Sequence, residues 1–344
     1  MAALDPASTP LKSLAESKGF LFGTSATPGD LKDPQFTSVV IQQCDLMATG
    51  LQLKWNMLRP TPEKYNFGPA DELLGFAQQN GMKFQGHVLA WHNALPDWFG
   101  SYATPQNAQQ LMLSHIKTVV GRYAGKMHSW DVVNEALLPS DQRSDGLRNT
   151  PWLQLIGPDY IELAFHAAAA ADPHAILFWN DYGIENESPE HELKRKFFLQ
   201  HLTALRQRDV PIQAIGIQSH LDASSKHFPG PQFDAFLHQV SDMGLKIMVT
   251  ELDFTDSLPS SDSAARNQLI ASRYEQYLDL VLKHHSVIAV LTWGIADKHT
   301  WLNGNYKFPR KDNSPFLPLP FDTNTQPKPA WYAMARAFQN APSR

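Results

Sequence analysis

One stretch organises this sequence: residues 130–136 read Trp-Asp-Val-Val-Asn-Glu-Ala. The apolar run is typical of a short buried strand, and it ends in an amide and a carboxylate, Asn134 and Glu135. A similar run, Ile-Met-Val-Thr-Glu at residues 247–251, ends in Glu251. Two strands that each end in a glutamate predict an active site built from two carboxylates.

Similar apolar runs recur along the chain and alternate with longer helical patterns. Strands are expected at residues 20–23, 51–55, 83–88, 127–133, 175–180, 213–218, 246–251 and 288–293. Helices are expected at residues 11–18, 71–79, 106–123, 158–171, 189–208, 232–243, 263–284 and 331–339. Eight strands with crossovers between them predict an α/β fold, a single (β/α)8 barrel. The barrel is expected to span residues 11–344, after an N-terminal tail of residues 1–10, with the Pro-rich stretch 309–329 as a long loop.

Composition excludes several classes of function. The net charge of −5 gives no basic surface for a polyanion, so we expect no nucleic-acid partner. No apolar run approaches the roughly 18 residues that a membrane-spanning helix needs, so no membrane partner is expected. A single cysteine, Cys44, excludes a disulfide within the chain and argues against a Cys-based zinc site.

The compartment stays open at this level. The first residues, Met-Ala-Ala-Leu-Asp-Pro, carry neither the basic nor the long apolar run of a signal peptide. Such a start fits a cytoplasmic protein, or a secreted one whose signal peptide has been replaced by a start Met. We expect a secreted or periplasmic monomer, with the cytoplasm as the alternative.

Polar and aromatic residues follow nearly every predicted strand. In a (β/α)8 barrel these positions meet at one face and carry the chemistry. Each one alone could be a cap or a satisfied partner, but structural needs do not concentrate so many of them there. The set suits glycoside hydrolysis, in which one carboxyl is protonated and the other ionised. Its members are Lys54, His87, Trp91, His92, Asn134, Glu135, Asn180, Asp181, Tyr182, Gln218, His220, Glu251, Asp253, Trp293, Asp297 and Trp301.

These residues lie in stretches that resemble glycoside hydrolase family 10, a β-1,4-xylanase family. The matching stretches are Gly-His-Val-Leu-Ala-Trp-His at 86–92, residues 130–136, Asn-Asp-Tyr at 180–182, Gly-Ile-Gln-Ser-His-Leu at 216–221, Thr-Glu-Leu-Asp at 250–253 and Trp-Gly-Ile-Ala-Asp-Lys at 293–298. They occur in order along nearly the whole chain. The resemblance implies a retaining hydrolase of β-1,4-xylosidic bonds in xylan or xylo-oligosaccharides, with no metal and no organic cofactor.

The resemblance also implies roles for individual residues. Glu135 would be the general acid/base and Glu251 the nucleophile, with their carboxyls about 5–5.5 Å apart. Asn134 would bind the 2-hydroxyl of the sugar at the cleavage point, and His220 would hydrogen-bond Glu251. The pKa of Glu135 is expected above that of an ordinary Glu, because the charge of Glu251 lies nearby. The remaining sugar-binding residues would be Lys54, His87, Trp91, Tyr182, Gln218, Trp293 and Trp301.

Three places depart from the family's pattern. The family usually carries Glu-Asn-x-x-Lys at the second strand, whereas here Gly50 and Leu51 replace the Glu and Asn and Lys54 is kept. Ala94 stands where the family has a Gln, and Gly183 where it has an Asn. All three departures are expected to remove polar contacts from the subsite one sugar beyond the cleavage point, the −2 subsite. We therefore expect altered specificity there.

Three other interpretations remain. A zinc hydrolase could use His87 and His92, although their spacing is not a recognised ligand pattern. A non-catalytic carbohydrate-binding barrel is disfavoured because both carboxylates and their Asn and His supports are present. A β-glycosidase of the same clan, acting on a decorated or non-xylan glycoside, is favoured by the altered subsite.

Overall fold

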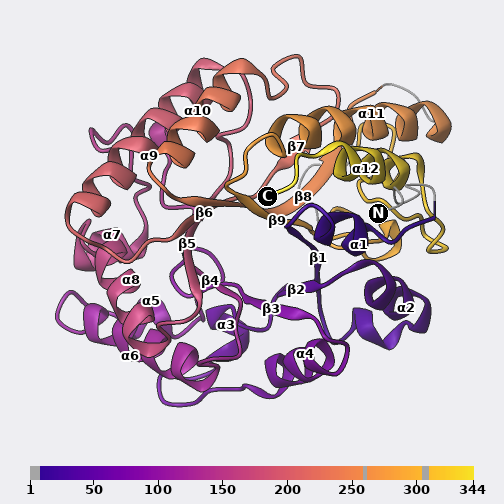
Figure 1. Ribbon diagram of the computed structural model, residues 1–344. Helices are drawn as coiled ribbons and strands as arrows, with labels where there is room; N and C mark the ends of the chain where they lie inside the picture. The colour runs from indigo at the N-terminus through magenta and orange to yellow at the C-terminus, as the bar shows by residue number, and fades with distance from the viewer. Residues whose placement is uncertain (1–7, 259–261, 304–309) are drawn as a thin grey trace.

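A closed barrel of parallel strands forms the centre of the molecule, with helices around it (Figure 1). The computed structural model describes residues 8–258, 262–303 and 310–344. Residues 1–7 of the expected tail, and residue 309 of the expected loop, lie outside the described residues. Strands β1–β6, β8 and β9 follow one another around the barrel, and pairing of β6 with β8 closes it. The predicted (β/α)8 barrel is confirmed.

The strands are short and buried on both faces, as parallel barrel strands must be. Small and apolar side chains from several strands, among them Leu46, Phe178 and Met248, fill the interior of the barrel. The strands are β1 (Leu21–Ala26), β2 (Leu46–Thr49), β3 (Lys83–Gly86), β4 (Ser129–Asn134), β5 (Ile176–Asp181), β6 (Ala214–Ile217), β7 (His220–Asp222), β8 (Lys246–Thr255) and β9 (Val287–Thr292). The short β7 pairs with the end of β8 beyond the barrel wall.

The predicted second strand is wrong. Residues 51–54 form a turn that leads into the short helix α3 (Trp55–Leu58), and the strand lies earlier, at Leu46–Thr49. Its four residues are all buried and pair with both β1 and β3. Leu51, in contrast, is 44% exposed. The other seven predicted strands overlap observed ones.

The helices cover the outside of the barrel. The eight predicted helices are observed with shifted ends, and α2 was missed although Asp33 caps it and Pro34 opens it. Besides α3, the helices are α1 (Leu11–Glu16), α2 (Pro34–Gln43), α4 (Gly68–Gln79), α5 (Phe99–Tyr102), α6 (Ala108–Arg122), α7 (Pro151–Ile156), α8 (Tyr160–Ala171), α9 (Pro189–Gln207), α10 (Pro231–Asp242), α11 (Ser263–Val281) and α12 (Pro329–Asn340), with 3-10 turns at Asp30–Lys32, Pro139–Asp141 and Asp297–His299. Like α2, the short helices α3, α5 and α7 were not predicted.

The loop between the 3-10 turn at Asp297–His299 and α12 is tied to the barrel by buried charges over its described part. Asp256, which follows β8, pairs with Arg266 of α11 and with Arg310 of the loop. Lys328 Nζ lies 2.7 Å from the buried Asp297 Oδ2. These pairs hold the loop against the rim where the candidate site lies.

Candidate active site

The candidate site lies at the carboxyl ends of the barrel strands. Strand register places Asn134 of β4 beside Asn180 of β5, and Asn180 beside Gly216 of β6. Glu135 follows β4 directly, and Glu251 lies in β8 where the pairing with β9 shifts register. Such irregularities re-aim a side chain relative to its strand. Glu135 and Glu251 are 9% and 5% exposed, so both residues are buried at this end of the barrel.

Glu251 is held by hydrogen bonds to both of its oxygens. Asn180 Nδ2 donates to Oε1 at 2.9 Å, and His220 Nε2 lies 3.3 Å from Oε2. The other ring nitrogen of His220 lies 2.8 Å from Asp253 Oδ1. Trp301 Nε1 in turn donates to Asp253 Oδ2 at 2.7 Å. The expected contact between His220 and Glu251 is confirmed, and this chain of contacts fixes the direction of the carboxylate.

The electrostatics favour an ionised Glu251. Burial alone would raise its pKa, but the hydrogen bond from His220 and the positive charges of His87, His220 and Lys54 outweigh burial, and the pKa lies below the usual value. The pKa of His220 is raised well above its usual value: burial opposes this, but the charges and hydrogen bonds of Asp253 and Glu251 prevail. His220 and Glu251 therefore support each other in their charged forms.

The surroundings of Glu135 shift its pKa in the opposite direction, upward. Burial raises its pKa, the hydrogen bond from Gln218 opposes the rise, and the charges of Asp181 and Glu251 add to it. The raised pKa agrees with the expectation, but burial, and not the charge of Glu251, is the main cause. Gln218 Nε2 donates to both Glu135 Oε1 and Asn134 Oδ1, at 3.0 Å each.

The backbone of Glu135 is also constrained. Its φ of 55° lies in the left-handed region that side chains other than glycine rarely adopt. Its amide donates to the Asn180 carbonyl at 2.9 Å, and Arg148 Nε donates to its carbonyl at 2.8 Å. Arg148 Nη2 also donates to the Tyr182 hydroxyl at 2.8 Å. Arg148 thus connects the predicted acid with the predicted sugar-binding Tyr182.

A buried network supports the floor of the site. His87 Nδ1 lies 2.8 Å from Asp131 Oδ2, which also accepts from Asn180 Nδ2 at 3.2 Å. Thr250 Oγ1 donates to Asn180 Oδ1 at 2.8 Å. An added Cβ at Gly216 would lie 2.3 Å from Asn180 Oδ1, so this glycine leaves the room that the Asn180 side chain occupies. Asp131, Thr250 and the space beside Gly216 therefore fix the position of the Asn180 side chain, which hydrogen-bonds Glu251.

Lys54 and the tryptophans form one wall of the site. Lys54 precedes α3 instead of ending a strand, yet its Nζ lies 4.9 Å from the centre of the Trp91 ring. Burial lowers the pKa of Lys54, whereas the charges of Glu251, Glu135 and Asp131 raise it. The Trp293 ring centre lies 5.3 Å from that of His87. These contacts place Lys54, Trp91 and Trp293 on one side of the site, and their binding of sugar stays a prediction.

Four supporting residues were given no individual role by the sequence: Asp131, Arg148, Asn180 and Asp253. Asn180 ends a predicted strand and Asp253 lies two residues after another, and these positions were a usable signal. Asp131 lies inside a predicted strand, and its bond to His87 gives it a supporting role. Arg148 comes from the irregular segment between β4 and α7, where no sequence pattern marks it.

A metal site finds no support in the described ranges. None of their His, Cys, Asp and Glu side chains form a cluster of three or more suited to a metal ion. His87 pairs with Asp131, and His92 Nε2 lies 3.9 Å from Glu135 Oε2. Burial lowers the pKa of His92 to about 4, so its imidazole stands neutral beside the acid near neutral pH. Within the same ranges, no helix has both the length and the apolar character to cross a membrane.

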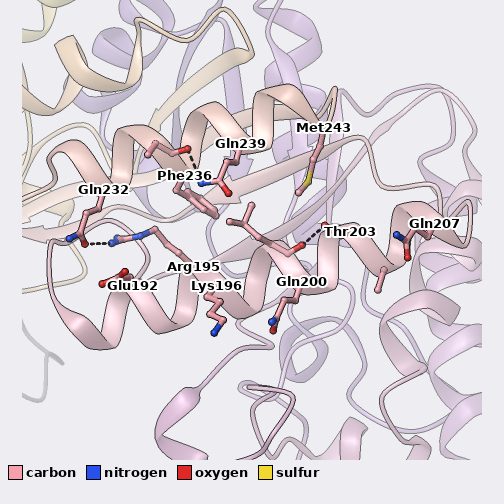
Figure 2. Close-up of a pocket in the computed structure, with 13 residues that line it drawn as sticks. Glu192, Arg195, Lys196, Gln200, Thr203, Gln207, Gln232, Phe236, Gln239 and Met243 are labelled. Carbon is pink, nitrogen blue, oxygen red and sulfur yellow. Dashed lines mark hydrogen bonds between the residues drawn. The ribbon is translucent and has the colours of Figure 1, made fainter.

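Of two hollows in the surface, one lies far from the site residues and the other is lined by some of them. A groove of about 750 Å³ lies between α9 and α10 on the outer wall of the barrel (Figure 2). Its lining includes side-chain amides such as those of Gln200 and Gln239, and it includes neither Glu135 nor Glu251. A smaller hollow of about 250 Å³ is lined in part by Lys54, Trp293 and Trp301. The second hollow is therefore an extension of the site.

Known proteins resemble this chain in sequence and in fold. The profile of glycosyl hydrolase family 10 matches residues 10–337. A β-1,4-xylanase of Dictyoglomus thermophilum is 37% identical over 298 residues, covering 83% of this chain and 79% of the relative. Endo-1,4-beta-xylanase B of Thermotoga neapolitana is 35% identical over 337 residues, covering 96% and 92%. The crystal structure of xylanase 10B from Thermotoga petrophila RKU-1 in complex with xylobiose has a TM-score of 0.86 at 32% identity, covering 96% of this chain and 97% of that one. The chain belongs to glycosyl hydrolase family 10 and is a glycoside hydrolase.

Proposed function

We propose that this enzyme hydrolyses β-1,4-xylosidic bonds in xylan or xylo-oligosaccharides, with retention of configuration. The observation that carries the proposal is a pair of buried glutamates whose pKa values are shifted in opposite directions, that of Glu135 upward and that of Glu251 downward. Such a divided pair is what the two steps of a retaining glycosidase require. The Thermotoga petrophila relative holds xylobiose, which supports a xylo-oligosaccharide substrate.

The two glutamates divide the reaction between them. In the first step Glu251 attacks the anomeric carbon and forms a glycosyl ester, while Glu135 gives its proton to the departing oxygen. In the second step Glu135 takes a proton from water, the water oxygen attacks the anomeric carbon, and Glu251 leaves as a carboxylate. Asn134 would donate from Nδ2 to the 2-hydroxyl, because Gln218 already occupies its carbonyl oxygen. The other sugar contacts would come from Lys54, His87, Trp91, Tyr182, Trp293 and Trp301.

The −2 subsite is proposed to differ from that of ordinary relatives. Gly50 and Leu51 line the hollow beside Lys54 and offer it no polar side chain. Ala94 and Gly183 do not line that hollow, and a Cβ at Gly183 would lie 3.9 Å from His191 and Lys194. The proposed change at the −2 subsite therefore rests on Gly50 and Leu51, and the expectation that Ala94 and Gly183 belong with them stays a prediction.

A substrate panel tests the function. Initial rates would be measured on aryl β-xyloside, aryl β-xylobioside, xylo-oligosaccharides and cello-oligosaccharides of matched length, with the anomer of the first product read by proton NMR. We expect β-anomeric xylo-oligosaccharide products and slow cleavage of cello-oligosaccharides. Preference for the cello-series would favour a β-glycosidase with a non-xylan substrate, and an α-anomeric first product would exclude the retaining mechanism.

Gly216→Ala tests the support of the nucleophile. The new methyl group would displace Asn180, which holds Glu251 Oε1, so kcat/KM is expected to fall about 100-fold through misplacement of the carboxylate. Gly75→Ala is the matched control, because nothing lies within 4 Å of its added Cβ on α4. The control should keep full activity and gain about 0.5–1 kcal/mol in the free energy of unfolding. Equal activity in both variants would contradict the role of Asn180.

His220→Asn tests the ionisation of Glu251. The hydrogen bond and charge of His220 lower the pKa of Glu251, so their loss should raise that pKa. Because the nucleophile must be ionised, the acid limb of the kcat/KM profile should move to higher pH. Profiles of the wild type and variant on an aryl xyloside would show the shift. An acid limb that stays in place would mean that His220 does not set this ionisation.

A further inference from the structure

The hollow beside Lys54 continues the catalytic cleft away from the glutamates. Its volume is about 250 Å³, and Trp293 and Trp301 wall it on the side of the site. Lys54 lies in both regions, since its charge interacts with Glu251 and Glu135 while its side chain lines the hollow. A sugar chain bound across the carboxylates would therefore place its next unit here. The remaining lining comes from Ser25, Ala26, Thr27, Asp30, Phe36, Gly50, Leu51, Gly294 and His299.

One side of this hollow is apolar. Leu51 lines the hollow and is 44% exposed, so its side chain presents an apolar surface there. Gly50 adds no side chain, and a Cβ there would already lie 3.3 Å from Thr27 Cγ2 and 3.4 Å from the Ala26 carbonyl oxygen. The wall formed by these residues offers carbon atoms to a ligand instead of hydrogen-bonding groups.

Asp30 and His299, which line the hollow, are committed to other protein groups. Asp30 Oδ2 accepts from both the amide and the hydroxyl of Thr27 at 2.8 Å, and Asp30 Oδ1 lies 3.3 Å from His299 Nδ1. His299 Nε2 lies 3.0 Å from Asp33 Oδ2, which also pairs with Lys298. A sugar hydroxyl that faces Gly50 and Leu51 would find few partners, and an unpaired buried hydroxyl is costly. A uronate would face the carboxylate of Asp30.

We propose that this hollow receives an O-acetyl group on the xylose unit at the −2 subsite, an inference that rests on the proposed xylan-hydrolysing function. Acetylation replaces a hydroxyl that the wall of Gly50 and Leu51 cannot pair, and it adds a methyl group that packs against Leu51 and Ala26. The ester is neutral, so it meets no repulsion from Asp30. Its carbonyl oxygen is an acceptor for the Ser25 hydroxyl in the wall. The substrate class is acetylated xylan or its oligosaccharides.

Paired substrates test this assignment. Xylotetraose and mono-O-acetyl xylotetraoses would be incubated with the enzyme at mildly acidic pH, with ester integrity and acetyl position in the products followed by NMR. The wild type should cleave the substrate acetylated at the −2 unit with a kcat/KM equal to or above that of xylotetraose. Its products should carry the acetyl group on the unit next to the new reducing end.

Leu51→Asn supplies the specificity readout. A polar side chain should raise kcat/KM on xylotetraose and lower it on the acetylated substrate, changing their ratio about three- to tenfold. Leu193→Asn on α9 is the matched control, because Leu193 is 42% exposed and lies outside the lining of the hollow. The control should leave the ratio unchanged.

The outcomes separate this proposal from the proposed function. Failure to cleave aryl xyloside and every xylo-oligosaccharide would overturn the function itself. Normal cleavage of xylotetraose with rejection of the −2-acetylated form would overturn the acetyl assignment alone. So would a Leu51→Asn ratio equal to that of the wild type, or a preference for glucuronosyl-substituted over acetylated substrates.

Discussion

Glu251→Ala is expected to reduce kcat/KM by on the order of 10⁵-fold on aryl glycosides and xylo-oligosaccharides alike. The variant lacks the group that forms the glycosyl ester, and no leaving group, however good, can replace it. Asn180 and His220 would be left facing an empty space of carboxylate size. Initial rates on both substrate classes would be measured beside Glu72→Ala, an exposed residue of α4 that should retain full activity.

Added azide makes the Glu251→Ala experiment diagnostic. A small anion can enter the space left by the carboxylate and attack the anomeric carbon from the same face. The product from a β-xyloside would then be the α-xylosyl azide, formed without a glycosyl ester. Substantial hydrolysis by the variant without azide would rule out Glu251 as the nucleophile.

Glu135→Ala is expected to show a strong dependence on the leaving group. The kcat/KM for xylo-oligosaccharides should fall by about 10²–10⁴-fold, because the departing sugar oxygen must be protonated. An aryl xyloside with an acidic phenol needs no such help, so its first step should persist. The second step should slow because water lacks its base. A burst of phenol followed by slow turnover, seen by stopped flow, would report the accumulated glycosyl ester.

The pH profile and azide identify Glu135 independently. The alkaline limb of the wild-type kcat/KM should lie above the range of an ordinary Glu, because burial raises the pKa of Glu135, and it should vanish in the variant. Azide should attack the glycosyl ester and give the β-xylosyl azide, the opposite anomer to that from Glu251→Ala. An unchanged alkaline limb in Glu135→Ala would assign the acid to another group.

The fold could be predicted because barrel strands are buried on both faces and therefore appear as continuous apolar runs. The prediction of the second strand was wrong for a physical reason. Residues 46–49 read Leu-Met-Ala-Thr and have one β-branched residue, while residues 51–55 hold the same number of apolar residues. Pattern alone does not separate two such runs. Pairing of Leu46 with both Gly23 and Lys83 decides between them, and that contact is tertiary.

The site could be predicted where its residues end apolar runs. Glu135, Gln218 and Glu251 all have such positions. Arg148 does not, because it comes from an irregular segment and finds Glu135 only after the chain has folded. The cause of the raised pKa of Glu135 was missed in the same way. Proximity to Glu251 could be anticipated, but burial depends on everything packed around the carboxyl.

The left-handed backbone of Glu135 means that stability and catalysis favour different residues at this position. A side chain in that conformation costs about 1 kcal/mol or more, and glycine would remove that cost together with a buried acid. Asn180 and Arg148 hold the peptide there in spite of it. A laboratory lineage propagated solely for resistance to unfolding would therefore tend to discard this glutamate, whereas one propagated on substrate would retain it at that expense.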